Sequence, residues 1–99
     1  SSDLAAVLDS PKIGDDEIIK IAGSRAVSDD ILRRISSRGP WLRLYEVKLN
    51  LVSNPKTPVG EAMKLIVHLR ESDMKRVAAS KNVSAAVRTA ANNHLKKRK

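Results

Sequence analysis

A five-residue pattern occurs four times in this chain of 99 residues. Each copy begins with a small polar residue, continues with two mostly polar residues and a β-branched residue, and ends on a residue suited to the start of a helix. The copies lie at residues 10–14, 24–28, 54–58 and 80–84. An apolar residue stands three positions before each copy, and another stands eleven positions after it. Such self-similarity predicts an array of short helices in which each copy starts a new helix.

Helix-start signals lie in and after these copies. Carboxylates at residues 15–17 and 29–30 suit a first helical turn, because they meet the positive end of the helix dipole. Ser28 is a good N-cap, and we expect Thr57 to cap a helix whose first residue is Pro58. The sequence predicts helices over about residues 4–8, 15–23, 28–37, 41–52, 58–69, 72–79 and 84–95.

The segment at residues 41–52 is the most apolar part of the chain. Gly39 and Pro40 are expected to end the helix before it. Its apolar side chains are spread around most of the helical circumference, which predicts a central helix that is covered on two sides. The alternation between Leu42 and Leu51 would also suit a strand, but no partner strand is evident elsewhere in the sequence.

The helix after Pro58 is expected to have two distinct faces. Its apolar face is predicted to consist of Ala62, Met63, Leu65, Ile66 and Leu69, with Glu61, Lys64 and His68 on the opposite face. The only two aromatic residues of the chain, Trp41 and Tyr45, lie four positions apart. Because they open the most apolar segment, we expect both in the core, although such a pair could also stack on a partner.

Charge is distributed unevenly along the sequence. The formal net charge is +8, but residues 1–30 hold seven acidic and three basic residues, and residues 31–99 hold four acidic and sixteen basic residues. A strongly basic half favours association with acidic or phosphate-bearing partners. The chain contains no cysteine, which excludes disulfides, thiolate metal sites and cysteine nucleophiles.

Length and composition indicate one domain. We expect residues 1–95 to form a single helical-repeat domain and residues 96–99 to form a disordered basic tail. No apolar stretch approaches the length of a membrane span, and the chain opens with no signal-peptide pattern, so a cytoplasmic protein without a membrane partner is expected. Because the chain begins with serine rather than methionine, we expect it to come from a longer polypeptide.

The copy at residues 54–58, followed by Leu65, resembles a unit of the leucine-rich repeat variant family. The family pattern is asparagine, proline, any residue, threonine and proline, then a helix with apolar residues near its middle and end. This α-solenoid family is similar in style to HEAT and armadillo repeats. The resemblance implies an all-α fold, a compact right-handed superhelical array of six or seven short helices, and a bacterial origin.

The distances between the copies refine the expected superhelical array. The copies begin fourteen, thirty and twenty-six residues apart, which favours a small capped array over a long, even superhelix. Some members of the family are attached to iron–sulfur modules, but a chain without cysteine cannot hold such a cluster, and no cofactor is expected. The resemblance brings no catalytic residues.

Basic residues are the strongest candidates for a binding site. Guanidinium and ammonium groups pair with carboxylate and phosphate oxygens. The candidate residues are Arg33, Arg34, Arg38, Arg43, Lys75, Arg76, Lys81 and Arg88. The favoured hypothesis is a non-catalytic interaction module, part of a larger bacterial regulatory protein, that binds an acidic protein partner through its basic half. Alternatives are a nucleic-acid-binding domain that uses the same arginines, a docking or dimerisation domain with no polyanion ligand, and solvated helix faces without a ligand.

No motif of an enzyme is present in the sequence. The only histidines, His68 and His94, lie twenty-six residues apart and have no carboxylate or cysteine at ligand spacing. We found no catalytic triad order, glycine-rich phosphate loop or metal signature. The sequence therefore predicts neither an enzyme nor a small-molecule substrate.

Overall fold

The structure is a computed structural model, and it describes residues 8–10 and 12–98. Within these residues it contains seven α-helices and no strand. The helices are α2 (Asp15–Gly23), α3 (Asp29–Ser36), α4 (Gly39–Leu42), α5 (Tyr45–Ser53), α6 (Val59–Ile66), α7 (Glu71–Ala79) and α8 (Ala85–Lys97). The predicted all-α class is confirmed. Most of the helix expected at residues 4–8 lies outside the described residues.

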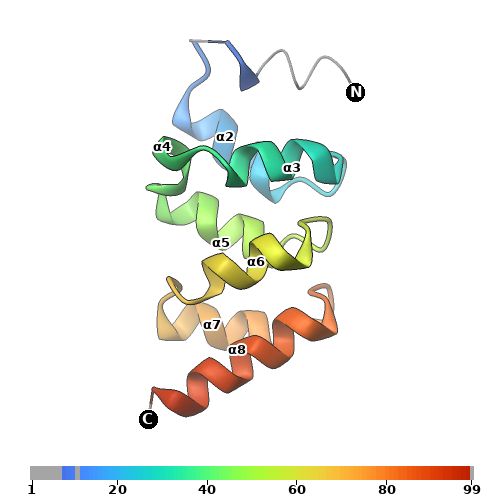
Figure 1. Cartoon of the computed structure of the whole chain (residues 1–99), viewed down its shortest axis with the longest axis vertical. Coiled ribbons are helices and arrows are strands. Elements are labelled where there is room, and N and C mark those ends of the chain that lie inside the picture. The colour runs from blue at the N-terminus through green and yellow to red at the C-terminus, as the bar shows by residue number, and fades with distance from the viewer. Residues whose placement is uncertain (1–7, 11, 99) are drawn as a thin grey trace.

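Six of the helices form three hairpins, α2–α3, α5–α6 and α7–α8 (Figure 1). In each hairpin a nine-residue helix is followed by a five-residue loop. The second helix has eight residues in α3 and α6 and thirteen in α8. The first helices lie in one layer and the second helices in another, and the hairpins follow one another along the 42 Å axis of the molecule. Contacts of α2 with α5 and of α6 with α8 join neighbouring hairpins.

The five-residue pattern forms the same local structure each time. A backbone N–H donates to the side-chain oxygen two residues earlier, which is the geometry of an Asx or Ser/Thr turn. The four bonds run from Lys12 to Ser10 (3.2 Å), from Ala26 to Ser24 (3.2 Å), from Lys56 to Asn54 (3.0 Å) and from Asn82 to Ser80 (3.3 Å). The last residue of each copy is the N-cap of the next helix.

The cap expected at Thr57 is wrong by one position. Pro58 is the N-cap of α6, with φ −53° and ψ 135°, and Val59 is the first helical residue. Thr57 is buried, as are Val27 and Val83 at the same place in the other two hairpin loops. The β-branched side chain at this position packs into the core, so the hydroxyl of Thr57 is not available to cap the helix. Ser28 and Ser84 do cap α3 and α8 through their side-chain oxygens.

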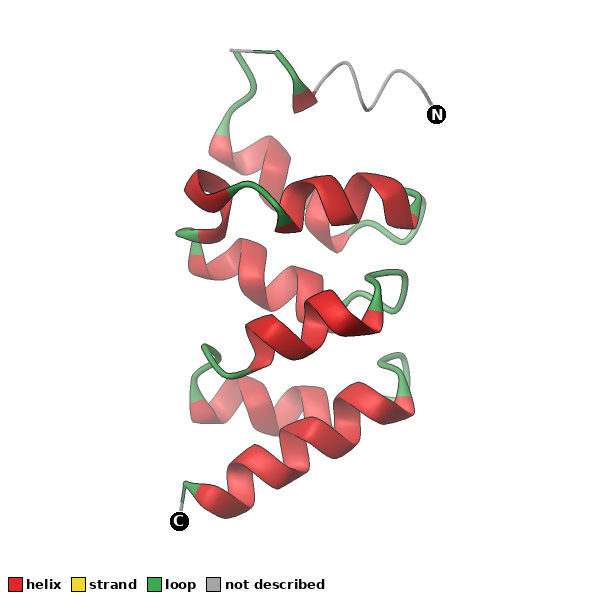
Figure 2. Ribbon diagram, in the orientation of Figure 1, coloured by secondary structure: helices red, strands yellow, loops and turns green. Residues whose placement is uncertain are grey.

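Residues 41–52 do not form one helix, contrary to the sequence prediction. Gly39 and Pro40 start the short helix α4, which ends at Leu42, and Leu44 has an extended conformation before α5 (Figure 2). Proline suits the first turn of a helix, because it has no N–H to leave unpaired. The break lets α4 pack beside α3 while α5 packs against α2 and α6. Periodicity alone does not reveal it, because the residues at the break are compatible with a helix.

The difference between the spacings of thirty and twenty-six residues arises in the connections between hairpins. Eight residues, 37–44, join α3 to α5, and they include the four residues of α4. Four residues, 67–70, join α6 to α7. Since the first helices and loops have the same lengths in all three hairpins, this four-residue difference accounts for spacings of thirty and twenty-six.

A continuous aliphatic core fills the space between the two layers. Its fully buried side chains include Ile18, Leu32, Ile35, Leu51, Ile66 and Met74. Trp41 and Tyr45 are half-buried and pack against this core. None of the helices in the described part of the chain is long and apolar enough to cross a membrane.

Helix α8 continues into the segment where a disordered tail was predicted. It extends through Lys97, and Arg98 is its C-cap. The guanidinium Nη2 of Arg98 donates to the carbonyl oxygen of Val67 at 3.2 Å, which ties the end of α8 to the end of α6. Residues 96–98 are therefore the last helical residues and their cap, and Lys99 lies outside the described residues.

Candidate interaction surfaces

Two of the candidate arginines are already engaged in intramolecular ion pairs. Arg33 lies 3.2 Å from a carboxylate oxygen of Asp30 and 4.0 Å from one of Asp29. Arg38 donates to Asp9 Oδ1 at 2.6 Å, and its guanidinium stands 4.7 Å from the centre of the Trp41 ring. The positive charge of these two side chains is thus partly compensated within the molecule.

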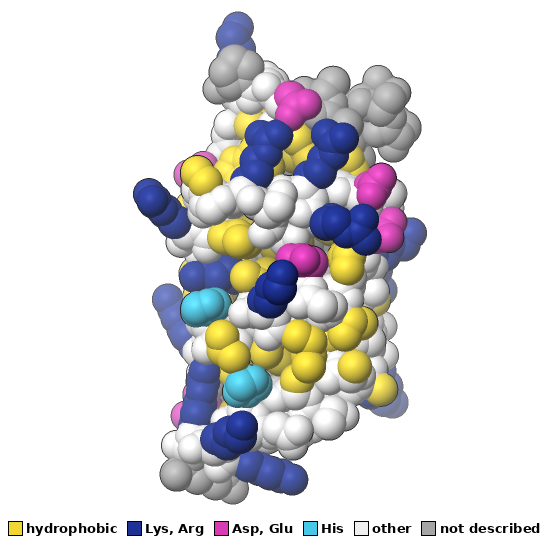
Figure 3. Space-filling model, viewed as in Figure 1, with side chains coloured by type: hydrophobic (Ala, Val, Ile, Leu, Met, Phe, Trp, Pro, Cys, Tyr) yellow, Lys and Arg dark blue, Asp and Glu magenta, His cyan; other side chains and the backbone are white. Residues whose placement is uncertain are grey.

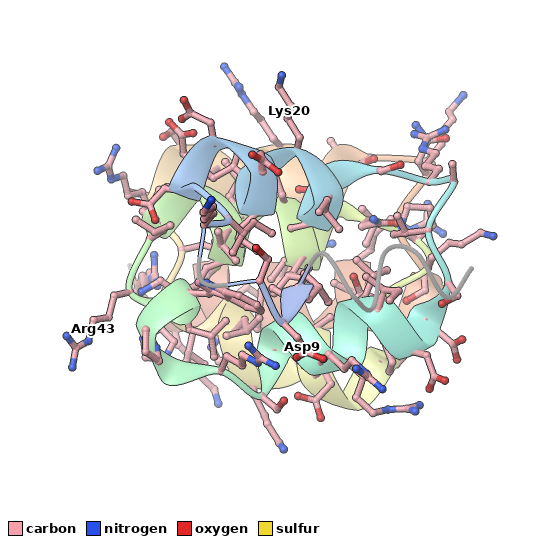
Figure 4. All side chains as sticks on the ribbon, turned by 90° about the horizontal axis from the view of Figure 1, so that it is seen from above. Asp9, Lys20 and Arg43 are labelled. Atoms are coloured by element: carbon pink, nitrogen blue, oxygen red, sulfur yellow. The ribbon has the colours of Figure 1, made fainter. Side chains whose placement is uncertain are left out.

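Arg34 and Arg43 have no carboxylate partner within the described residues. Both side chains are exposed. Figure 4 shows Arg43 pointing away from the ribbon, as does Lys20 on α2. These two arginines are the uncompensated members of the group that α3 and α4 carry at the N-terminal end of the stack.

The remaining candidates lie on the third hairpin. Lys75 and Arg76 are exposed on α7, Lys81 lies in the loop, and Arg88 is half-buried on α8. None of the four forms an ion pair within the described part of the chain. The structure therefore separates the eight candidates into two groups, one on α3 and α4 and one on the α7–α8 hairpin at the other end of the molecule.

Tyr45 ties α5 to the start of α7. Its hydroxyl donates to Asp73 Oδ2 at 2.6 Å and accepts the backbone N–H of Arg70 at 2.9 Å. The guanidinium of Arg70 lies 4.4 Å from the centre of the Tyr45 ring. Partial burial, together with the hydrogen bond to Asp73, raises the pKa of Tyr45 above its usual value of 10.0, because both disfavour the phenolate. A neutral phenol in this position joins two hairpins.

Helix α6 carries an exposed aliphatic surface that the sequence analysis missed. The buried side chains around this helix are Ala62, Leu65, Ile66 and Leu69, as expected. Met63, however, is 40% exposed, and Val59 and Val67 are 43% and 45% exposed. These three residues lie four positions apart, so they form one stripe along α6 and its C-cap. The repeated spacing outside the buried face was the available signal.

Glu61 was predicted on the solvent-facing side of α6 and is instead half-buried between helices. Ser36 Oγ donates to Glu61 Oε2 at 3.1 Å, which links α3 to α6. Lys64 Nζ lies 3.7 Å from Glu61 Oε1. The only carboxylate of α6 is therefore already occupied by two partners.

Open hollows on the described part of the surface lie near the start of α2 and between α2 and the start of α5. One is lined by Ser10, Lys12, Ile13 and Glu17, and the other by Asp15, Asp16, Ile19, Leu44, Tyr45 and Glu46. Within the part of the chain that the structure describes, no group of three or more histidine or carboxylate side chains is placed to hold a metal ion.

Comparison of the chain with protein-family models, with curated proteins and with solved structures yields no match. The resemblance to a leucine-rich repeat variant unit accordingly depends on residues 54–58 and Leu65 alone.

Proposed function

We propose that this chain is a non-catalytic interaction module that binds an acidic protein partner through its basic half. The observation that carries the proposal is the charge of the third hairpin. Helix α8 contains no acidic residue, and of the two on α7, Asp73 is bonded to Tyr45. The basic residues of the third hairpin form no ion pair within the described residues. They are Lys75, Arg76, Lys81, Arg88, Lys96 and Lys97. Uncompensated charge of one sign steers and holds partners of the other sign.

We also propose that the three hairpins constitute a short α-solenoid of the HEAT-like or leucine-rich repeat variant type, with a right-handed superhelical path. The same side-chain-to-backbone turn bond in each hairpin loop and the nine-residue first helices support this assignment. Stacked helical hairpins present long lateral surfaces, which such proteins use for binding. A place within a larger bacterial regulatory protein follows from the family resemblance and is part of the proposal.

Binding of a labelled oligoglutamate peptide tests the function. The triple variant Lys75→Glu, Arg76→Glu and Lys81→Glu should weaken binding by about tenfold or more, because it reverses the charge of the third hairpin. The matched control, Lys20→Glu, Arg25→Glu and Lys56→Glu, changes net charge equally on other exposed residues and should have a much smaller effect. Equal losses in the two variants, or no binding by the wild type, would contradict the proposal.

A DNA duplex titrated beside the peptide separates protein from nucleic-acid binding. If the duplex binds more tightly, and its affinity falls steeply as salt rises, phosphates are the ligand and the acidic-protein proposal is overturned. We expect the peptide to bind more tightly at physiological salt.

A further inference from the structure

The aliphatic stripe on α6 is the starting point. Val59, Met63 and Val67 are the exposed large hydrophobic residues among the described residues, and all three lie in one row. Single exposed aliphatic side chains are ordinary on a protein surface, whereas a row of them is typical of an interaction site. The row runs from residue 59 to residue 67, or about 12 Å along the helix.

The stripe belongs to a wider apolar face formed with α8. Helices α6 and α8 are in contact, and Figure 3 shows hydrophobic side chains gathered over these two helices. The bond from Arg98 to the Val67 carbonyl holds the C-terminal ends of the two helices together. Helix α8 begins with two exposed alanines, Ala85 and Ala86, whose small side chains allow close approach by a partner.

The charged side chains of α6 and α8 are almost all basic. Helix α6 contributes Lys64, and α8 with its cap contributes Arg88, Lys96, Lys97 and Arg98. The single carboxylate of the two helices, Glu61, is half-buried and already paired with Ser36 and Lys64. A partner that covers the stripe therefore needs an apolar centre with acidic flanks.

The spacing of the stripe specifies the shape of the partner. Consecutive side chains of the row are four residues apart, which is about 6 Å of rise along α6. A second helix lying alongside presents apolar side chains at the same interval when they stand at positions i, i+4 and i+7 or i+8. A nucleic acid would use the cations but would leave the aliphatic row uncovered by any apolar group.

We propose that the face formed by α6 and α8 is the docking site for an acidic amphipathic helix. This inference rests on the proposed function and names the class of partner and the place where it binds. Apolar residues of the partner cover Val59, Met63 and Val67, and its flanking carboxylates meet the cations of α6 and α8. None of these three aliphatic residues was named as a candidate for binding in the sequence analysis.

Two synthetic peptides test the inference. The first carries leucines at i, i+4, i+7 and i+11 among glutamates, and the second has the same composition in an order without helical periodicity. Fluorescence anisotropy should show that the wild-type protein prefers the amphipathic peptide by about tenfold, which is 1.4 kcal/mol. The double variant Val59→Ser and Met63→Ser should lose this preference and bind the two peptides equally.

Control measurements distinguish a loss of folding from a loss of binding, and they show where the peptide binds. Both substituted residues are exposed, so the helical circular dichroism should be unchanged, and the control variant Ala26→Ser with Ala79→Ser, on other exposed residues, should keep the preference. Amide chemical-shift changes on adding the amphipathic peptide should map to α6 and α8. Changes confined to α3 and α4, or to α7 and the loop that follows it, overturn the inference.

The remaining outcomes separate this inference from the proposed function. Equal wild-type binding of both peptides overturns the docking site but leaves acidic-partner binding intact, whereas no binding of either peptide overturns both. A dimer seen by light scattering and abolished in the double variant assigns the stripe to a second copy and overturns the inference. Stronger binding to vesicles of anionic lipid than to the amphipathic peptide also overturns the inference.

Discussion

Thr57 has a buried hydroxyl with no hydrogen-bond partner within the described residues. It is 6% exposed and occupies the position that valine holds in the other hairpin loops. Its methyl group suits the core as the methyl groups of Val27 and Val83 do, but the oxygen has lost water and gained no donor in return. Such a group costs about 1–3 kcal/mol relative to a satisfied one.

Replacing Thr57 by valine should therefore stabilise the protein. We expect Thr57→Val to raise the free energy of unfolding by about 1 kcal/mol, since it removes an unpaired polar atom and keeps the branched shape. Urea denaturation followed by circular dichroism measures the effect. The reverse change at an equivalent position, Val27→Thr, should lower stability. A destabilised Thr57→Val variant would mean that the hydroxyl has a partner such as water.

Tyr45 should titrate above the usual tyrosine range. It is the only tyrosine of the chain, so phenolate absorbance reports this group alone, and we expect its midpoint above 10.0 in the folded protein. Asp73→Asn should lower the midpoint only in part, because burial is the larger cause of the raised pKa. A midpoint at or below 10.0 would contradict both the partial burial of the phenol and its hydrogen bond to Asp73.

The same pKa predicts how stability depends on pH. Because the folded-state pKa lies above the unfolded value, the stabilising contribution of Tyr45 is complete below about pH 10 and is lost as pH rises through the folded pKa. Tyr45→Phe should remove this part of the alkaline loss of stability.

Among the secondary-structure elements, α5 makes the most specific connection between hairpins. Asn54 Nδ2 donates to the carbonyl oxygens of Ala22 and Ser24, both at 2.9 Å. Asn50 Nδ2, one turn earlier, donates to the carbonyl oxygen of Ile19 at 2.8 Å. The two bonds from Asn54 satisfy the carbonyls of Ala22 and of the C-cap Ser24 at the end of α2, which has no further turn to receive them. Two amides on one face of α5 thus fix its register against α2.

Asn54→Ser isolates this connection from the turn. Serine begins the other copies and accepts the same backbone N–H, so the loop should persist. The two bonds from Nδ2 to α2 are lost, and we expect the free energy of unfolding to fall by about 1–3 kcal/mol. Asn82→Ser, at an exposed loop position, is the control and should have little effect in the same urea titration. A neutral Asn54→Ser would contradict the role of these bonds.

At the scale of the whole molecule, the uncompensated charge and the exposed apolar surface do not follow the division of the sequence into an acidic and a basic part. The N-terminal half of the basic set is partly compensated by Asp9, Asp29 and Asp30. The third hairpin retains its positive charge, and the aliphatic stripe of α6 lies beside α8 in the adjoining hairpin. The proposed docking face thus combines residues from two hairpins, and neither hairpin carries it alone.

Local chemistry explains what could be predicted from the sequence. The five-residue pattern specifies its own turn, since a Ser or Asn side chain bonds a backbone N–H two residues away, and this needs no tertiary contact. Helices α2, α3 and α8 begin at the residues that the capping signals indicate. The all-α class and the buried positions of α6 other than Met63 follow from helical periodicity in the same way.

Packing between hairpins decided the features that the sequence analysis did not predict. Whether residues 41–52 form one helix or two depends on the distance that the chain must cover between α3 and the layer of α2, α5 and α7. Thr57 points inward because the equivalent space is apolar in every hairpin, which overrides its tendency to cap a helix. Ion pairs of Arg33 and Arg38 and the exposure of Met63 likewise depend on which helices become neighbours. The sequence by itself determined the helical units and their turns, and the tertiary structure alone decided which charges and which aliphatic side chains remain on the surface, because these depend on contacts between hairpins.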